Sequence, residues 1–442
     1  MGRALAALIP VTSLVTMAVI PAADAEDGAT ETTTEAPANP TPAPEETTPP
    51  EGTLTTTTDS EPWGLSTEAT PSWGTAKVSD KNRAQKVNAI VEAGGVAYLG
   101  GQFTKMVPPG GGSGVSRNYL AAIDAATGAL KSWNPKASGK VWALELSADG
   151  KSLYVGGDFS YIGGKYTTKL AKVDLATGKP DTSFRPSVKG RVRGLALHGD
   201  RLYVGGDFTT IGGQSRPKLA AVNPTTGALL SWTPPVLGDG RYLGQTGVPT
   251  PDYEAGDVYA VEAIGGKVFA GGTFTNFGGE GGLVTIDAAT GGLVEPQYEP
   301  GRPIFDLDTY GGILYAVGGG PGGRVYAFSP DDDDALWKVK TDGDNMGVAA
   351  SANAVYVAGH YDYVVSAKSS CWQYCPGKGP RRHHLAAFNR ADGALLPWNP
   401  DADTSTGPYT VAVGEDAAYF GGEFLNINFK KQPGFTIFPG TP

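Results

Sequence analysis

Three histidines, His360, His383 and His384, are the first residues in this sequence whose type and spacing could do chemistry. Imidazole nitrogens bind zinc and related metals, and a carboxylate such as Asp362 could complete a ligand set. No motif such as His-Glu-x-x-His fixes their spacing, and the whole chain contains four histidines. We therefore predict no metal site and keep these three residues only as candidates. The alternative is that they hold the long loop around them in place.

The two cysteines, Cys371 and Cys375, lie in that same loop. A local disulfide is the favoured interpretation for a chain that reaches an oxidising compartment. A redox or metal role is the alternative, but the pair lacks the two-residue spacing of a Cys-x-x-Cys motif.

Motifs for nucleophilic or cofactor-dependent catalysis do not occur. The sequence contains no Gly-x-Ser-x-Gly elbow and no phosphate-binding loop. We therefore predict no catalytic residues and no cofactor.

A repeated segment determines which elements must position any site. The run Leu-Tyr-Val-Gly-Gly-Asp-Phe at 153–159 occurs in recognisable form seven times, with its second glycine at Gly101, Gly157, Gly206, Gly272, Gly319, Gly359 and Gly422. Subtraction gives spacings of 56, 49, 66, 47, 40 and 63 residues. These values are close to one blade of a β-propeller, roughly 40 to 50 residues, with loop insertions.

Each copy can be divided into four short strands separated by turn signals. In the second copy they are 141–146, 152–158, 170–174 and a shorter strand near Phe184. We therefore predict an all-β fold, a seven-bladed β-propeller of four-stranded blades. A tryptophan five residues after the turn glycine in three copies, Trp133, Trp232 and Trp398, is interpreted as a wedge between neighbouring blades.

The two ends of the repeat region predict how the ring closes. The last copy supplies three strands, through Phe438, whereas 71–73 repeats the sequence pattern of the fourth strand at 131–133. We predict that the N-terminal strand around Trp73 completes the last blade. Closure of this kind protects sheet edges that would otherwise be exposed.

The variable positions of the repeat are the candidate binding residues. The second residue of the first strand changes from copy to copy while its neighbours repeat, and its occupants are Asn88, Trp142, Arg193, Tyr259 and Phe305. Aromatic rings and an arginine near a central pocket suit a sugar or a peptide. The alternative is that they only plug the channel mouth. The long insertions, at 105–118, 236–257 and 363–384, should emerge on the same face, where binding residues often lie.

The N-terminal region has a different composition. Residues 1–25 read as a signal peptide, and 26–71 as a disordered acidic stalk rich in Thr, Pro and Glu. The segment 26–70 holds ten acidic residues and no Lys or Arg, so the formal charge of -10 belongs to it. The propeller, 72–442, then has no net charge, and we expect no nucleic-acid partner. We expect a secreted, extracellular monomer without a membrane span after signal cleavage; attachment to the cell surface is left open.

The repeat resembles a known family. The run 219–232, with 202–213 before it, is similar to the delta-60 repeat family of secreted bacterial β-propellers. The resemblance covers roughly 73–438 and implies an extracellular propeller, but no general activity. A partial match to the blade motif of quinoprotein dehydrogenases also exists, at Ala122, Asp124, Gly128 and Trp133, with the tryptophan one residue late.

Two functions follow from this reading. The first is a non-enzymatic binding or scaffold protein that recognises a glycan or a protein through its loop-rich face. The second is an extracellular enzyme, either carbohydrate-active or a quinoprotein-like oxidoreductase, that uses the same face.

Overall fold

The structure is a computed structural model that describes residues 64–442 except 80, 82, 239–255, 276–280, 299, 321, 333, 372–373 and 404–406. The chain divides into two compact units, Met1–Thr57 and Thr58–Pro442, and all described residues belong to the second. The expected signal peptide and most of the expected stalk therefore lie outside the described residues, as does most of the insertion at 236–257.

Regular secondary structure in the described residues is entirely β-strand, which confirms the all-β prediction. None of these residues forms a helix long and apolar enough to span a bilayer. The sheets that carry the repeat are antiparallel. They are β2–β3–β6 (Val87–Ala93, Val96–Gly101, Leu120–Asp124), β7–β8–β11 (Val141–Leu146, Ser152–Gly157, Leu170–Asp174), β13–β14–β17 (Val192–His198, Arg201–Gly206, Leu219–Val222), β18–β19–β20 (Val258–Ile264, Lys267–Thr275, Gly281–Asp287), β21–β22–β23 (Ile304–Tyr310, Ile313–Gly318, Arg324–Phe328), β25–β26–β28 (Asp344–Ala350, Ala354–His360, Leu385–Asn389) and β29–β30–β33 (Pro408–Val413, Ala417–Gly422, Phe435–Pro439).

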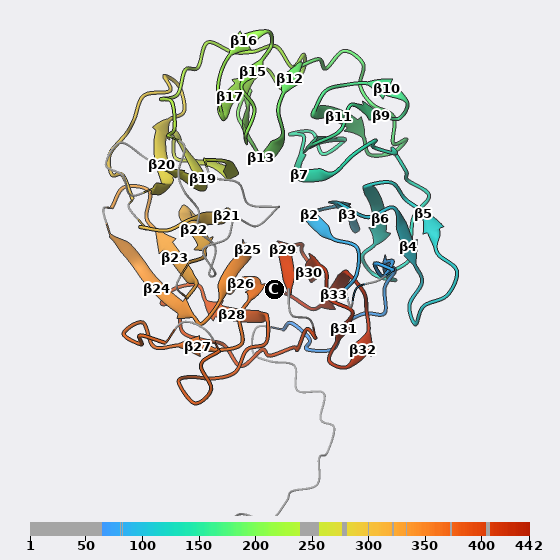
Figure 1. Cartoon of the computed structure of the whole chain (residues 1–442), viewed down its shortest axis with the longest axis vertical. Helices are drawn as coiled ribbons and strands as arrows, with labels where there is room; N and C mark the ends of the chain where they lie inside the picture. Colours follow the sequence, from blue (N-terminus) through green and yellow to red (C-terminus); the bar gives the residue numbers. More distant parts are fainter. Residues whose placement is uncertain are drawn as a thin grey trace, which may run out of the picture. The chain divides into compact units, whose positions relative to one another are not determined.

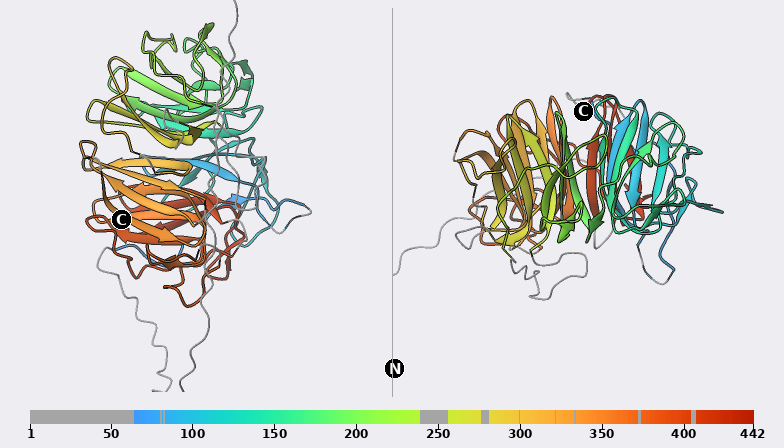
Figure 2. Two further views of the ribbon diagram at one scale, coloured as in Figure 1. Left: turned by 60° about the vertical axis from the view of Figure 1, so that its left-hand side comes forward. Right: turned by 90° about the horizontal axis from the view of Figure 1, so that it is seen from above.

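These sheets lie around a common centre, and the first strand of each is innermost (Figure 1). Neighbouring sheets pack face to face, as the two side views show (Figure 2). The inner strands contact one another in chain order, and β29 contacts β2. The space at the centre is therefore surrounded by the first strands of successive repeats.

The double glycine of the repeat is required by this packing. A Cβ added at Gly156 would lie 2.6 Å from Cγ1 of Val192, on the inner strand of the next sheet. A Cβ at Gly157 would lie 2.2 Å from the carbonyl oxygen of Lys140, just before the inner strand of its own sheet. The absence of a Cβ at the first glycine thus allows the neighbouring sheet to pack closely. Its absence at the second allows the backbone before the inner strand of the same sheet to pass close by.

The predicted fourth strand is mostly reduced to a single pairing. Within the described ranges, only the sheet of β21–β23 has a regular fourth strand, β24 (Ala335–Thr341), to which the short β27 (Val364–Val365) adds. Elsewhere in the described residues one residue after the Asp/Asn…Gly turn forms an isolated antiparallel bridge to the third strand, as Leu130 does with Ile123. The chain then turns away towards the next sheet, so four regular strands per blade were too many.

A short hairpin follows the second strand in several repeats. These hairpins are β4–β5 (Lys105–Val107, Val115–Ser116), β9–β10 (Tyr161–Ile162, Lys165–Tyr166), β15–β16 (Thr210–Ile211, Gln214–Ser215) and β31–β32 (Asn426–Ile427, Lys430–Lys431). The segment that arrives from the preceding sheet pairs with the hairpin: β1 (Gly74–Thr75) with β4, and β12 (Val188–Lys189) with β15. Each linker is thereby fixed to the sheet that follows it.

The tryptophans join successive sheets. The indole Nε1 of Trp133 donates to the backbone oxygen of Asp174 at 3.2 Å, and Trp232 donates to Asp287 at 2.9 Å. Both rings are buried, which agrees with the predicted wedge. The sequence pattern missed Trp337, whose Nε1 donates to the backbone oxygen of Arg390 at 3.0 Å.

The residues just before Trp73 lie against the last sheet. Thr70 bridges Ile437 of β33, and the N–H of Ser66 donates to the backbone oxygen of Pro439 at 2.8 Å. The side chain of Leu65 is buried in the same core cluster as Trp398. Leu65, Ser66 and Thr70 therefore all contact the last sheet or its core.

Candidate functional site

A cavity of ≈ 460 Å³ occupies the centre, lined by the inner strands. All the binding residues predicted from sequence line it, although they come from different sheets and are separated by up to 217 positions (305 − 88). They are Asn88 (β2), Trp142 (β7), Arg193 (β13), Tyr259 (β18) and Phe305 (β21).

Each of these residues is the extra residue of a β-bulge. The pairing of β7 with β8 shifts register between Val141 and Ala143, which leaves Trp142 unpaired. The same shift brackets Asn88, Arg193, Tyr259 and Phe305 on their strands. A bulge re-aims the side chain of its extra residue and is often found beside functional sites. Here the bulges bring one variable side chain from each repeat to the cavity.

Two more residues belong to this ring and were missed in the sequence. Met346 and Tyr409 are the bulge residues of β25 and β29 and also line the cavity. A usable signal existed, because each stands two residues before a recurring apolar residue, Val348 or Val411, as Trp142 stands before Leu144.

Arg193 is the centre of the cavity mouth. Its guanidinium carbon lies 4.7 Å from the ring centroid of Trp142 and 5.0 Å from that of Tyr259. Its Nε is 3.0 Å from Oδ2 of Asp257, and both side chains are buried. Arg193 thus lies within cation–π distance of two aromatic rings and forms a buried ion pair with Asp257.

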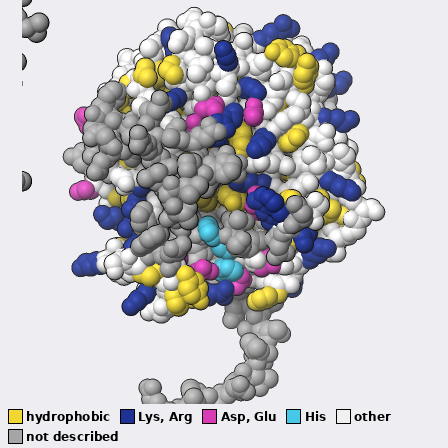
Figure 3. All heavy atoms as spheres, viewed as in Figure 1, with side chains coloured by type: hydrophobic (Ala, Val, Ile, Leu, Met, Phe, Trp, Pro, Cys, Tyr) yellow, Lys and Arg dark blue, Asp and Glu magenta, His cyan; other side chains and the backbone are white. Residues whose placement is uncertain are grey.

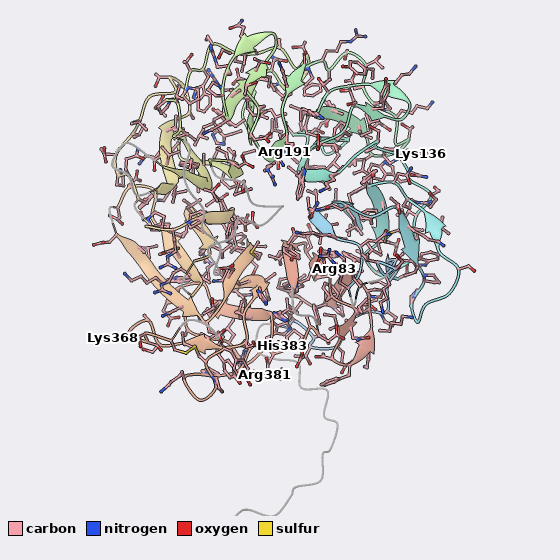
Figure 4. The ribbon with its side chains drawn as sticks, viewed as in Figure 1. Arg83, Lys136, Arg191, Lys368, Arg381 and His383 are labelled. Carbon is pink, nitrogen blue, oxygen red and sulfur yellow. A yellow bond between two sulfur atoms is a disulfide. The ribbon has the colours of Figure 1, made fainter. Side chains whose placement is uncertain are left out.

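A second arginine lies beside this pair. Arg191 Nη2 is 2.5 Å from Oδ2 of Asp207 and 3.9 Å from Oδ2 of Asp257. Figure 4 shows Arg191 at the inner edge of the ring of sheets. The carboxylates of Asp207 and Asp257 therefore hold two neighbouring guanidinium groups, and of these two arginines Arg193 lines the cavity.

Two polar atoms of the mouth are buried without a hydrogen-bond partner among the described residues. They are Oδ1 of Asn88, an acceptor, and Nε1 of Trp142, a donor. The other side-chain atom of Asn88, Nδ2, donates to the backbone oxygen of Val141 at 2.8 Å, next to Trp142. Buried polar atoms normally have partners. An unused donor and an unused acceptor on adjacent strands suit a ligand group that can both donate and accept.

Carboxyl groups line the cavity further along the inner strands. Burial raises the pKa of Glu145 to about 7, against the hydrogen bond from the N–H of Leu197. Burial likewise raises the pKa of Asp306 to about 7 and of Asp308 to about 6. For Glu262, burial and then the neighbouring Asp308, Glu145 and Asp306 hold the pKa well above its usual value. Burial in this part of the cavity therefore moves the ionisation of these carboxyl groups towards neutral pH.

Most of these carboxyl groups also join neighbouring inner strands. Glu145 of β7 accepts from the N–H of Leu197 on β13 at 3.1 Å. Asp306 and Asp308 of β21 accept from the N–H groups of Val348 and Ala350 on β25, at 3.0 and 2.6 Å. They satisfy backbone donors that the innermost edge of a sheet leaves unpaired.

The histidine candidates come together in the sheet β25–β26–β28. The ring centroids of His383 and His384 are 4.1 Å apart, and those of His360 and His384 are 5.9 Å apart. Nδ1 of His383 is 2.6 Å from Oδ1 of Asp401, and its Nε2 is 3.4 Å from Oδ1 of Asp362. No group of His, Cys, Asp or Glu in the described part of the chain is arranged to hold a metal ion. Figure 3 shows the histidines as one group, and Figure 4 labels His383 beside Arg381.

His384 has a structural role in the backbone just before β28. Its φ is 72°, and its N–H donates to the backbone oxygen of Tyr361. Lys169 and Lys218, just before the third strand of their own repeats, have the same left-handed φ and the same bond to an aromatic residue. The predicted disulfide between Cys371 and Cys375 is present, with an S–S distance of 1.97 Å.

Comparison with known families supports the class of fold. A family described as a β-propeller domain of unknown function, DUF5122, matches residues 148–184 and 200–229. A second family, PQQ_2, described as outer membrane protein assembly factor BamB, matches residues 218–407. The chain therefore carries β-propeller domains. The delta-60 repeat expected from sequence is not among the names of these families.

Comparison with individual proteins adds two structures. The computationally designed Ika8 protein has 12% identity and a TM-score of 0.45, covering 82% of this chain and 98% of its own. U3-55K has 10% identity and a TM-score of 0.49, covering 84% of this chain and 100% of its own. No curated protein matches the chain.

Proposed function

We propose that this chain is a secreted, non-enzymatic binding protein, a seven-bladed β-propeller that holds a segment of glycan or peptide in the mouth of its central cavity. The observation that carries the proposal is the ring of bulge residues, which gathers one side chain from each repeat around a single cavity. A concave site with aromatic walls and a few polar groups is the usual form of a small-ligand site.

The sheet contacts support seven blades and closure by the N-terminal segment. In an internal blade, Leu130 bridges the third strand and Trp133 follows three residues later; at the N-terminus, Thr70 bridges β33 and Trp73 follows three residues later. Trp398 donates from the preceding sheet to the backbone oxygen of Ser66 at 3.1 Å, as Trp133 donates to the next blade. The segment 66–75 thus makes the contacts of a linker between the last blade and the first.

The glycine contacts give the same result independently. A Cβ at Gly421 of the last sheet would lie 2.6 Å from Cγ1 of Val87 in the first, the relation that Gly156 has to Val192. The last sheet therefore meets the first in the way that internal neighbours meet, which supports a ring.

Binding is favoured over catalysis by what the carboxyl groups do. Glu145, Asp306 and Asp308 each accept a backbone N–H from the next inner strand, a structural use that accounts for their position. The quinoprotein-like alternative has the PQQ_2 match at 218–407 in its favour. Fold alone does not transfer a chemistry, so we retain the binding role.

The ligand that best fits the mouth carries hydroxyl groups. Nε1 of Trp142 can donate to a hydroxyl group and Oδ1 of Asn88 can accept from one, while aromatic faces contact the apolar side of a sugar ring. We also propose export by the segment 1–25 and an acidic spacer at 26–71, since both rest on the composition of these segments.

The test is a glycan and cell-wall binding screen with Trp142→Phe and Asn88→Ala. Trp142→Phe removes the indole donor and keeps an aromatic ring, and we expect roughly a tenfold loss of affinity because a hydrogen-bonding atom is left without its partner. Tyr374→Phe, on an exposed ring that does not line the cavity, is the matched control. Glycan binding unchanged in both cavity variants would remove the proposed site.

A further inference from the structure

The tip of the hairpin β31–β32 carries a phenyl ring where its counterpart carries glycine. Its turn residues Asn428 and Phe429 have φ values of 47° and 62°; in β9–β10 the turn residues are Gly163 and Gly164, at 55° and 75°. Left-handed backbone is strained for a bulky residue. Phe429 is 91% exposed, so burial of its ring does not offset this backbone strain. The described fold gives no reason to prefer phenylalanine to glycine there.

A small hollow lies beside this tip. It measures ≈ 100 Å³ and lies between the hairpin and the loop of β4–β5, with Pro109, Gly110, Lys430 and Lys431 in its lining. A Cβ at Gly111 would be 2.6 Å from Nζ of Lys431, so a glycine there gives the ammonium room to lie over the loop. The hollow has space for a single acidic group.

The two lysines at the hollow differ in their partners. Lys430 pairs with Glu68, whereas Lys431 is exposed and has no ion-pair partner within the described residues. Glu68 also lines the hollow, so its lining carries two ammonium groups and one carboxylate. The remaining positive charge, on Lys431, favours an anion there.

The hairpins next to this one are also basic. The segments 103–118, 159–169, 208–218 and 424–432 contain no Asp or Glu, although the region 72–442 as a whole has no net charge. Their hairpins follow one another around the rim (Figure 1), and Lys and Arg side chains are prominent along the right-hand rim in Figure 3. The basic residues of these segments are Lys105, Arg117, Lys165, Lys169, Arg216, Lys218, Lys430 and Lys431.

Exposed aromatic rings accompany the lysines. Tyr161 and Tyr166 pair across β9–β10, are 49% and 71% exposed, and have ring centroids 5.4 Å apart. Lys165 precedes Tyr166, and Lys430 follows Phe429. A sugar ring that bears an acidic group needs this pairing, an apolar face for the ring and an ammonium for the charge.

We propose that these hairpins form a docking surface for an anionic polysaccharide, with the acidic group of one sugar in the hollow beside Lys431 and its ring against Phe429. None of these residues lines the central cavity, so the surface goes beyond the proposed function and can fail without it. Basic residues spread over four separate hairpins suit a polymer with about one charge per sugar better than nucleic acid, which takes a continuous basic groove.

The test measures binding of the full chain to polygalacturonate, alginate and dextran sulfate, with neutral dextran as the uncharged reference. Phe429→Gly should weaken binding about fivefold by removing the ring contact. It should leave the melting temperature equal or higher, because glycine relieves the left-handed strain. Lys431→Gln should weaken binding by a similar factor and flatten its salt dependence, since one charge contact is lost. Lys151→Gln, an exposed lysine in the turn between β7 and β8, is the control and should change nothing.

Four results would overturn the proposal. They are no binding to any of the three anionic polymers, equal binding to neutral dextran, unchanged binding by both hairpin variants, and tighter binding to phosphatidylglycerol vesicles or single-stranded DNA. Loss of binding in Trp142→Phe with no effect of the hairpin variants would leave the cavity site standing and remove this surface.

Discussion

At the scale of single residues, the buried carboxyl groups of the cavity make the stability of the protein depend on pH. Burial raises the pKa of Glu145 to about 7 from a usual value near 4.5. Between these values the folded state binds more protons than the unfolded state, so the free energy of unfolding falls as pH rises. The contribution is fully present below about pH 4 and is lost as pH rises through about 7.

Glu145→Gln tests this sign. The amide keeps an oxygen that can accept from the N–H of Leu197 but no longer ionises. We expect the variant to be more stable than the natural protein at pH 8, by roughly 1–3 kcal/mol because water in the cavity reduces the full effect. At pH 4.5 the two should unfold alike. Thermal unfolding from pH 4.5 to 8 measures the difference, with Glu415→Gln, an exposed carboxylate, as control. An equal change in stability at pH 4.5 and at pH 8 would contradict the predicted pH dependence.

At the scale of the elements, the first glycine of each repeat sets the distance between neighbouring sheets. Gly156→Ala would place a Cβ 2.6 Å from Cγ1 of Val192, so the sheets must separate. We expect a loss of about 1–3 kcal/mol, the usual cost of overpacking. In a Val192→Ala background the same change should cost much less, because the clashing methyl is gone. Chemical denaturation of the natural protein, the two single variants and the double variant gives the coupling free energy between the two positions.

A control for this cycle is available in the same chain. A Cβ at Gly292 would have only Thr290 Oγ1 within reach, at 3.6 Å, so Gly292→Ala should be nearly neutral. If the effects of Gly156→Ala and Val192→Ala on the free energy of unfolding are additive, the two positions are not coupled through a steric clash.

The elements also show why the sequence predicted part of the site and missed the rest. Variation at one strand position led to Trp142 and Arg193, because framework residues repeat while cavity residues do not. The bulges that turn these side chains inward are a matter of backbone register, which no residue type marks. The cross-strand bond from Leu197 to Glu145 joins different repeats, and a pattern within one repeat cannot show it.

At the scale of the whole molecule, the repeat predicts the features that every copy shares. It does not predict those that differ between copies or arise between them. The repeated residues gave the all-β fold and the tryptophan wedge, both of which the structure shows. The fourth strand was overestimated because the residues after the turn form one bridge and then leave the sheet. The basic hairpins were missed because summing charge over the folded region hides its uneven distribution.

The N-terminal segment 64–70 is attached to the last sheet through Thr70. The N–H of Thr70 donates to the backbone oxygen of Ile437 at 2.8 Å, in the only bridge that joins residues 64–70 to the last sheet among the described residues. Thr70→Pro removes this donor and disfavours the extended pairing. If the segment closes the ring, the whole propeller should lose stability cooperatively, by about 2–3 kcal/mol, with an unchanged single transition.

Thr57→Pro, in the segment expected to be a stalk, is the matched control and should leave the melting temperature unchanged. Differential scanning calorimetry distinguishes the outcomes. A separate low-temperature transition in Thr70→Pro would mean that the last sheet melts by itself and that the segment is an attachment to it. An unchanged melting temperature would contradict closure by this segment and would leave the contact between β29 and β2, where Gly421 faces Val87, to join the last sheet to the first.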